Sequence, residues 1–392
     1  MLFVGIDVAK SKHDFCIIDS SGVILSHSLS FPNSLTGFEF LCSTIISFLP
    51  DKDLSNVKIG LESTGHYSTN LTNYLYSKGF QIITLNPLAI SLFRKAKTLR
   101  KTKTDKTDAM VIANMLFSDE SKSYSPVSYH INELKSLTRN RHRLINYQSK
   151  LKMSFTRLVD IIFPEIVEAA PSLHQKYVYA LFLQYPNTNV ISNLHLTKLT
   201  NLFKKASNNK CGKDKALAIK QLAENSIGSC SPSISFEIQQ TIRLIQYVEA
   251  EIELLDEQIE SIVKELNSTI ITIPGISYTL AAIIIAEIGD IKRFSSPSKL
   301  LAFAGMEPST YQSGNYKASN TPMVKRGSTY LRWAVIQASK SVAQNDQTFK
   351  EYLNKKRSEG KHYHVAVSHV GKKLIRVIHY LMSNNIEFVS QF

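Results

Sequence analysis

The sequence predicts an α/β domain at the N-terminus, followed by long helices and a mainly α-helical C-terminal part. Up to about residue 125, short apolar runs typical of strands alternate with helical patterns, and beyond it two long stretches keep apolar residues at helical spacing. With 392 residues, 43% hydrophobic and 20% charged, the chain can bury two or three cores. We divide it into residues 1–125, a helical region at 126–265, a C-terminal domain at 266–350 and a basic helical tail at 351–392.

The chain is strongly basic, with a formal net charge of +14. Such an excess favours a polyanionic partner, and nucleic acid is the usual one. No stretch reaches the roughly 18 apolar residues of a membrane span, and the start MLFVGIDVAK carries an acid where a secretory signal is apolar. We therefore expect a cytoplasmic, nucleoid-associated protein with no membrane partner. The four cysteines lack CxxC spacing, which indicates neither a zinc site nor a disulfide framework.

The first domain is expected to contain one sheet with helices between its later strands. The predicted elements are a strand at 2–9, a hairpin of strands at 14–18 and 23–31, a helix at 35–49, a strand at 56–63, a helix at 68–78 and a strand at 81–87. Three strands in a meander followed by alternating helix and strand is the order of an RNase H-like domain. In that architecture, acids on separate elements converge at one end of the sheet.

Acids occur at several places where they need a partner. Asp7 lies in the first strand, where a carboxylate is costly without a metal, a hydrogen bond or a cation, and a salt bridge to Lys10 or Lys12 is the simple alternative. Glu62 lies on the strand at 56–63. Asp105 and Asp108 are spaced i, i+3, which places both on one face of the first turns of a helix.

A cationic run leads into this aspartate pair. We take its residues as candidates for binding a nucleic-acid backbone: Arg94, Lys95, Lys97, Arg100, Lys101 and Lys103. Acids beside such a run suggest metal ions that grip a phosphate backbone. The alternative is a solvated helix start with aspartates at favourable N-terminal positions.

Two long helices are predicted in the helical region, at 134–162 and 238–266, each with a seven-residue repeat that is cleaner in the second. We expect them to pair as a coiled coil, within one chain or between chains, and a core helix of an ordinary bundle is the alternative. Residues 171–230 contain short helices and basic loops, to which we assign no chemistry.

The pattern changes at Ile270, where a short helix, a Pro-Gly turn and a longer apolar helix ending at Gly289 are expected. This resembles a helix-hairpin-helix, whose turn offers backbone amides to a phosphate, although a plain packed helix pair is also possible. The histidines of the tail are expected to touch phosphate or to pack rather than to bind metal, because His362 and His364 do not share a helix face.

Three segments, GIDVAK at 5–10, LESTGHY at 61–67 and KTDKTDAMVIA at 103–113, resemble the motifs of the DEDD transposases, the IS-one-ten group of insertion-sequence recombinases. The N-terminal domain of that family is similar to the RuvC resolvase, so the resemblance implies a RuvC-like fold. It also implies that the catalytic, metal-binding acids are Asp7, Glu62, Asp105 and Asp108. Four carboxylates brought together repel one another unless cations neutralise them. Two Mg²⁺ ions are the expected cofactors, with Mn²⁺ possible.

The stretch 303–339 resembles the C-terminal signature of the same family, which implies that Ser313 of the Ser-Gly pair is the nucleophile. Gly314 would let a backbone approach closely. The cations expected around the phosphate are Lys317, Lys325, Arg326 and Arg332. The neighbouring hydroxyls of Ser309, Ser319, Tyr311 and Tyr316 stay open as alternatives. After the Ser-Gly pair this chain has NYKASNTP, whereas the family often has a glycine-rich basic tract, so the loop shape departs from the family pattern.

The resemblance implies a site-specific transposase that cleaves and exchanges DNA strands through a serine-DNA intermediate. It further implies donor and target DNA as partners, guidance by an RNA that the element encodes, and a homo-oligomer, a dimer or tetramer, held by the coiled coil. Two other classes remain: a RuvC-like junction nuclease that uses water, and a nucleic-acid-binding protein without catalysis.

Overall fold

The computed structural model describes residues 1–62, 67–85, 87–97, 105–118, 129–309, 312–313, 316–317 and 321–390. For residues 87–89, 97, 105–106, 129–130, 312–313 and 316–317 it describes the backbone alone. The chain forms two compact units, Met1–Val127 and Ser128–Phe392, which are described separately. Within the described part, no helix is both long enough and apolar enough to cross a bilayer.

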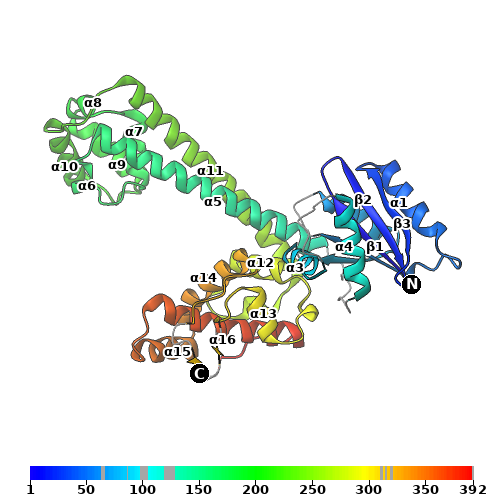
Figure 1. The fold of residues 1–392 in the computed structure, drawn as a ribbon. Coiled ribbons are helices and arrows are strands. Elements are labelled where there is room, and N and C mark those ends of the chain that lie inside the picture. The colour runs from blue at the N-terminus through cyan, green and yellow to red at the C-terminus, as the bar shows by residue number, and fades with distance from the viewer. Residues whose placement is uncertain are drawn as a thin grey trace. The chain divides into compact units, whose positions relative to one another are not determined.

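The first unit is built on a five-stranded sheet with the order β3-β2-β1-β4-β5 (Figure 1). Its strands are β1 (Leu2–Val8), β2 (Lys12–Asp19), β3 (Ile24–Pro32), β4 (Val57–Glu62) and β5 (Gln81–Leu85). The first three strands pair antiparallel, whereas β4 pairs parallel with both β1 and β5. The expected meander followed by parallel strands is therefore confirmed, and the arrangement is consistent with a RuvC-like domain.

Helices lie on both faces of this sheet. They are α1 (Leu35–Ser47), the short 3₁₀ helix η1 (Leu54–Asn56), α2 (Ser68–Ser77), α3 (Pro87–Lys97) and α4 (Asp105–Ser118). One face, which includes Val4 and Ile6 of β1, packs against Leu41 of α1 and Leu71 of α2. The other face packs against α4, as successive residues of a strand point to opposite sides.

Glycine allows α4 to lie directly on the sheet. A Cβ atom at Gly5 would come within 2.2 Å of the carbonyl oxygen of Ala109 and 2.3 Å of the amide nitrogen of Ala113. A Cβ atom at Gly60 of β4 would meet the side chain of Leu116 at 2.7 Å. The absence of side chains at these two strand positions therefore fixes the close packing of α4 against β1 and β4.

The second unit contains an antiparallel helical hairpin, α5 (Tyr129–Ile162) and α11 (Pro232–Leu266), visible in Figure 1. Arg141 of α5 pairs with Asp256 of α11 at 2.6 Å, and Arg157 pairs with Glu237 at 2.9 Å. The partners run in opposite directions along the two helices, so the pairing occurs within one chain. Every heptad position predicted between 238 and 266 is buried or half-buried. The supercoiled packing of a coiled coil stays a prediction.

Each end of this hairpin joins a separate hydrophobic core. The core at one end contains Phe155 and Ile162 of α5 and Ile238 of α11, packed against short helices of residues 166–224. These helices are α6 (Ile166–Ala169), α7 (Lys176–Gln184), α8 (Thr188–Ser192), α9 (Leu196–Ala206) and α10 (Lys213–Glu224).

The core at the other end contains Leu134 and Ile259 together with the C-terminal helices. The elements there are η2 (Thr269–Thr272), α12 (Tyr278–Ile288), η3 (Ile291–Arg293), α13 (Pro297–Phe303), β6 (Gln312–Ser313), β7 (Tyr316–Lys317), α14 (Thr329–Asn345), α15 (Gln347–Ser358) and α16 (Tyr363–Asn384). The predicted long apolar helix ending at Gly289 is therefore present.

The element before that helix is a four-residue 3₁₀ helix, η2, so the local pattern is found but a helix-hairpin-helix is not established. The turn between them packs closely on α14. Gly275 has φ +90°, and a Cβ atom there would lie 2.8 Å from the backbone of Ser341. Glycine is thus required at this turn both by its backbone conformation and by its contact with α14.

Candidate active site and nucleic-acid interface

The predicted acids of the first unit gather at one end of the sheet. Asp7 and Glu62 lie near the carboxyl ends of the parallel strands β1 and β4, where Ile6 is paired with Leu61. Paired residues of neighbouring strands face the same side, and the alternation along both strands places Asp7 and Glu62 on the side of Gly5 and Gly60. Both acids therefore face the side of the sheet that α4 covers.

Helix α4 runs opposite to β1 and brings its first turns to the same end. Ala109 and Ala113 meet Gly5, whereas Phe117 contacts Phe3 with ring centroids 5.6 Å apart. The helix begins at Asp105, whose backbone lies in its first turn. Asp108 directly precedes the buried Ala109 and is itself 5% exposed. The structure thus brings Asp7, Glu62, Asp108 and the backbone of residue 105 to one end, while the Asp105 side chain lies outside the described residues.

Asp108 already has a cationic partner in this structure. The Nη2 atom of Arg94, on α3, lies 2.7 Å from Oδ1 of Asp108, with side-chain exposures of 22% and 7%. Within the described part of the chain, Oδ1 of Asp108 and Nε of Arg94 are buried without a hydrogen-bond partner. The contact is therefore an ion pair of poor hydrogen-bond geometry. Arg94, which we predicted to bind nucleic acid, neutralises a predicted metal ligand.

The acids suit a divalent cation chemically, because carboxylate oxygens are the ligands that Mg²⁺ and Mn²⁺ prefer. The Oδ1 atom of Asp108 is already paired with Arg94, so a divalent cation there would have to replace that guanidinium. Among the side chains that the structure describes, no three His, Cys, Asp or Glu residues lie close enough to hold a metal ion together. Asp105 is the predicted ligand whose side chain is not included in that statement.

A fifth carboxylate, Asp14, faces the same side of the sheet. Asp14 is paired directly with Asp7 in the antiparallel register of β1 and β2, and it is 3% exposed. Its carboxylate accepts a short hydrogen bond from the hydroxyl of Ser30 and lies 3.9 Å from Nζ of Lys12. From the sequence we assign Asp14 no role, because an aspartate near a hairpin turn is usually structural. The strand register, which pairs residue 7 with residue 14, was the signal that could have found it.

The structure describes two of the remaining candidates in the cationic run, Lys95 and the backbone of Lys97. Lys95 is exposed on α3 and is free to meet a polyanion. For Lys97 the structure describes the backbone alone. Arg100, Lys101 and Lys103 lie outside the described residues.

Ser313 lies in a small antiparallel hairpin of the second unit. In its register Gln312 is paired with Lys317, and Ser313 with Tyr316. The hairpin arms extend further back, since Ser309 donates its amide to the carbonyl of Pro322 at 2.8 Å. The side chains of Ser313, Tyr316 and Lys317 are not described, and Tyr311 and Ser319 lie outside the described residues. The backbone therefore places residue 313 opposite residue 316 in this antiparallel pair.

The cations that follow the hairpin have different roles. Lys325 and Arg326 are exposed, and Lys325 has the left-handed φ of +57°. Arg332 donates from Nη1 to the carbonyl of Lys325 at 3.1 Å and to that of Ala304 at 3.3 Å. The guanidinium of Arg332 thus holds the loop that presents Lys325 and Arg326, in addition to any contact with phosphate.

A buried acid anchors this loop to the helical hairpin. Glu287 of α12 is 3% exposed and accepts hydrogen bonds from Nε of Arg139 at 2.9 Å and from the hydroxyl of Ser328 at 2.8 Å. Ser328 also caps α14, because its hydroxyl accepts from the amide of Leu331. Lys135 lies nearby, and burial lowers its pKa, while the carboxylate of Glu287 opposes that effect. Sequence reasoning missed this network, because Glu287 is surrounded in the sequence by apolar residues.

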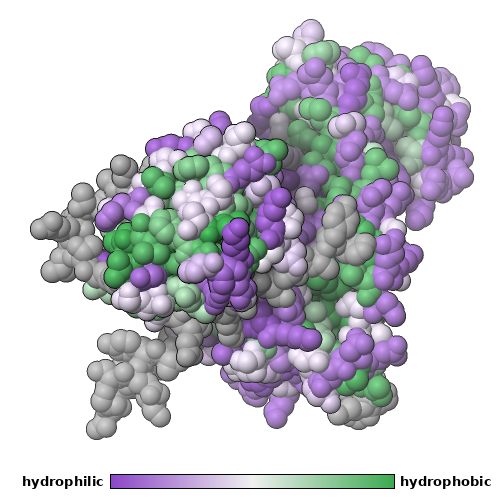
Figure 2. All heavy atoms as spheres, turned by 90° about the vertical axis from the view of Figure 1, so that its right-hand side faces the viewer, coloured by the Kyte–Doolittle hydropathy of each residue, from purple (hydrophilic) through white to green (hydrophobic). Residues whose placement is uncertain are grey.

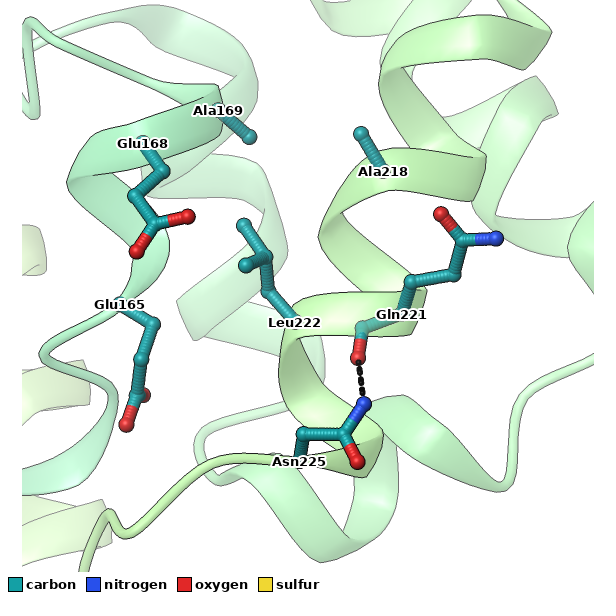
Figure 3. Close-up of a pocket in the computed structure, with 7 residues that line it drawn as sticks. All are labelled: Glu165, Glu168, Ala169, Ala218, Gln221, Leu222 and Asn225. Carbon is teal, nitrogen blue, oxygen red and sulfur yellow. Dashed lines mark hydrogen bonds between the residues drawn. The ribbon is translucent and has the colours of Figure 1, made fainter.

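The core of short helices carries a pocket of about 400 Å³ between α6 and α10. Figure 3 shows Glu165 and Glu168 on one side of it and Ala218 and Leu222 on the other. Glu165 is already bound by the hydroxyl of Ser226 at 2.6 Å. Two carboxylates would repel a phosphate. The pocket therefore does not serve as a nucleic-acid site.

On the surface shown in Figure 2, hydrophilic and hydrophobic residues lie side by side.

The tail histidines contact neighbouring backbone. His379 makes a hydrogen bond of 2.9 Å with the carbonyl of Phe294, and His362 accepts from the amide of His364 at 3.4 Å. Burial of His369 lowers its pKa. Thiol chemistry is disfavoured at Cys16 of β2 and Cys42 of α1, because burial raises the pKa of both to about 11.

Two family models match the chain. Residues 4–164 match the DEDD transposase model of the IS110 type, described as a transposase. Residues 267–354 match the model described as the transposase IS116/IS110/IS902 family. The first match contains the acids, and the second contains the Ser313 hairpin.

Relatives are similar over nearly their whole length. The chain is 21% identical to the mini-circle putative transposase for IS117 of Streptomyces coelicolor, over 100% of this chain and 96% of that protein. It is 22% identical to the pilin gene-inverting protein of Moraxella bovis, over 98% of this chain and 97% of that protein. The fold and these matches define an enzyme of the transposase and recombinase class, which acts on DNA. Within that class, the chain belongs to the IS110 family of insertion-sequence transposases.

Proposed function

We propose that this transposase cleaves and exchanges DNA strands by transesterification, with Ser313 as nucleophile and the acids of the first unit as its metal-binding centre. The observation that carries the proposal is the convergence of Asp7, Glu62 and the first turns of α4 at one end of the sheet. Acids on three elements of one fold are the arrangement expected for a phosphodiester-cleaving site.

Asp7, Glu62, Asp105 and Asp108 would hold two Mg²⁺ ions. When bound, such ions polarise the phosphodiester and neutralise its negative charge. The chain supplies the rest of the charge balance. Lys95 and its neighbours in the cationic run bind the DNA backbone, as do Lys325 and Arg326 next to the Ser313 hairpin.

The proposed chemical step forms one bond for each bond that it breaks. The Oγ atom of Ser313 forms a bond to phosphorus, the bond between phosphorus and the 3′ oxygen breaks, and the serine proton is lost as the 3′ hydroxyl gains one. A second strand's 3′ hydroxyl then displaces Ser313 in the reverse exchange. The phosphodiester energy is retained in the serine-DNA bond, so strand exchange needs no ATP.

The partners are proposed from the family resemblance and from charge. They are donor DNA, target DNA and a guide RNA that the element encodes, for which the net charge of +14 is suited. We further propose a dimer or tetramer, held by coiled-coil contacts of the α5 and α11 hairpin, in which the acids of one protomer work with the serine of another. We keep the division of the chain into four parts, residues 1–125, 126–265, 266–350 and 351–392, as part of this proposal.

The test is a denaturing gel of labelled donor and target DNA, incubated with Mg²⁺ and with protein coexpressed with the flanking non-coding DNA of its element. Wild type, Ser313→Ala and Asp105→Ala are compared. A covalent DNA adduct formed by wild type, and by neither variant, is the expected result. Treatment of the copurified nucleic acid with ribonuclease before the assay tests the guide: full activity without RNA would exclude it.

The other two classes give different results in the same gel. If the protein is a junction nuclease, wild type and Ser313→Ala would cleave DNA equally well, leaving free ends and no adduct. A binding protein without catalysis would retain its function in Asp105→Ala. Either pattern would overturn the proposal.

A further inference from the structure

Trp333, the sole tryptophan of the chain, lies on α14 with 39% of its surface exposed. Tryptophan side chains are highly buried on average, so this exposure needs a reason. The ring is held from a second helix: His142 of α5 contacts it with ring centroids 6.1 Å apart and planes at 75°. His142 also contacts Tyr330, one helical turn before Trp333, at 5.1 Å and 81°. Packing therefore fixes Trp333 in place while leaving much of it accessible.

The surroundings of this ring favour a negatively charged partner. Helix α5 carries no Asp or Glu between residues 134 and 159, and α14 carries none at all. The guanidinium of Arg139 lies 4.9 Å from the centre of the Tyr330 ring and remains 39% exposed. Arg143, next to His142, is also exposed. Two acids of other helices reach α5 here, and arginines pair with both: Glu287, 3% exposed, with Arg139, and Asp256 with Arg141.

We propose that Trp333 stacks against an unpaired nucleobase, while Arg143 neutralises the adjoining phosphate. An exposed aromatic ring within a cationic surface is the arrangement by which proteins hold single-stranded nucleic acid, because every base has a stackable face. A duplex offers no such face along its length, since its bases are already stacked on one another. The site is thus a single-strand clamp, formed by Arg139, His142, Arg143, Tyr330 and Trp333. This inference rests on the proposed function, because it takes nucleic acid to be the partner.

The single tryptophan makes the test direct. The full-length protein is titrated with a short single-stranded DNA, with RNA of the same sequence and with the matching DNA duplex, while tryptophan emission is recorded. Single strands are expected to quench Trp333 strongly and the duplex weakly. The arm with the greater quenching, DNA or RNA, identifies which single strand the clamp holds.

Variants then measure the contribution of the ring to affinity, with a fluorescent label on the oligonucleotide. Trp333→Ala is expected to weaken single-strand binding about fivefold or more and to leave duplex binding unchanged. Trp333→Phe, which keeps a stackable ring, should retain most of the affinity and guards against a loss caused by misfolding. Tyr147→Ala is the matched control, since Tyr147 is an aromatic residue of α5, 57% exposed and outside the clamp.

The proposal is overturned if saturating single-stranded oligonucleotide leaves the emission unchanged, or if Trp333→Ala weakens duplex and single-strand binding alike. It is also overturned if emission shifts with protein concentration in the absence of nucleic acid, since Trp333 would then lie between copies of the chain. Ser313→Ala binds single strands normally in this scheme. Failure of the clamp and failure of serine catalysis are therefore distinguishable.

Discussion

Arg94 and Asp108 form an ion pair of 2.7 Å between α3 and the first turns of α4. A cation supplied by the chain thus lies against an acid that we assign to metal binding. The same guanidinium lies in the run assigned to DNA binding. If Asp108 binds a metal as proposed, Arg94 would compete with that ion for the carboxylate, and its release would make it available to a phosphate.

Arg94→Gln tests this competition. We expect the metal-free variant to lose stability, because a buried carboxylate without its partner costs about 3–5 kcal/mol. Addition of Mn²⁺ should raise its melting temperature more than that of wild type, since no internal cation has to be displaced. Lys95→Gln, the same charge change at the exposed neighbouring residue, should behave like wild type. An equal Mn²⁺-induced shift in Arg94→Gln and wild type would contradict the competition.

Gly5→Ala tests the close packing of β1 and α4. The new Cβ atom would approach the backbone of Ala109 and Ala113 to 2.2 and 2.3 Å, so α4 must move. We expect the free energy of unfolding to fall by about 1–3 kcal/mol or more, and cleavage to fall with it as the first turns of α4 shift along the sheet. Gly212→Ala is the control, because nothing lies within 4 Å of its Cβ position. Wild-type stability of Gly5→Ala in urea denaturation would show that the packing is looser than described.

Glu287→Gln tests the buried network that anchors the Ser313 domain. The amide cannot neutralise Arg139, which would leave a partly buried charge, and we expect a loss of about 3–5 kcal/mol in urea denaturation. Glu237→Gln removes the acid of an exposed ion pair, with partners 58% and 50% exposed, and should cost about 0–1 kcal/mol. Similar losses in the two variants would mean that the anchor contributes no more than a surface pair.

His13 makes the stability of the first unit sensitive to acid. Burial lowers the pKa of His13, although a hydrogen bond to Asn33 and the charge of Asp14 partly oppose this. The folded state therefore prefers the neutral ring, and the unfolded state binds a proton first as the pH falls below about 6.5. The contribution is full above that pH and is lost as the pH falls towards the folded pKa.

The measurement is the free energy of unfolding at pH 7.5 and at pH 5.5 for wild type and His13→Leu. Wild type should lose up to about 1.4 kcal/mol per pH unit more than the variant in this window. The variant is expected to be less stable at pH 7.5, because the ring nitrogen of His13 accepts a hydrogen bond from the amide of Ala9. Identical pH dependence in the two proteins would place the titration elsewhere.

Much of the sheet could be predicted, because its strands are short apolar runs bounded by turn residues. The hairpin turn is an example: Asp19 accepts hydrogen bonds from the amides of Ser21 and Val23, which is a local interaction that the sequence itself specifies. The two long helices could be predicted because apolar residues recur at helical spacing, and the repeat positions of the second are buried or half-buried in the hairpin. Helix α3 was missed, since its basic residues were interpreted only as a binding stretch.

The contacts that could not be predicted join distant segments. Asp14 lies opposite Asp7 because of the strand register, and the pairing of Arg94, a predicted nucleic-acid contact, with Asp108 comes from the packing of α3 on α4. Glu287 is 148 residues from Arg139 along the chain, and only the tertiary packing brings them together. Local patterns predict elements, whereas partners across elements require the fold.

The helical hairpin also sets the distance between two hydrophobic cores. Leu134 belongs to the core that contains the C-terminal helices, and Phe155 belongs to the core of short helices. Both residues lie on the single helix α5. At 1.5 Å per residue they are about 32 Å apart, close to one turn of B-DNA at about 34 Å. Removing one heptad from both α5 and α11 would shorten this spacing by about 10 Å while keeping the buried faces in register. The length of the hairpin therefore fixes the separation of the two cores at about one helical turn of DNA.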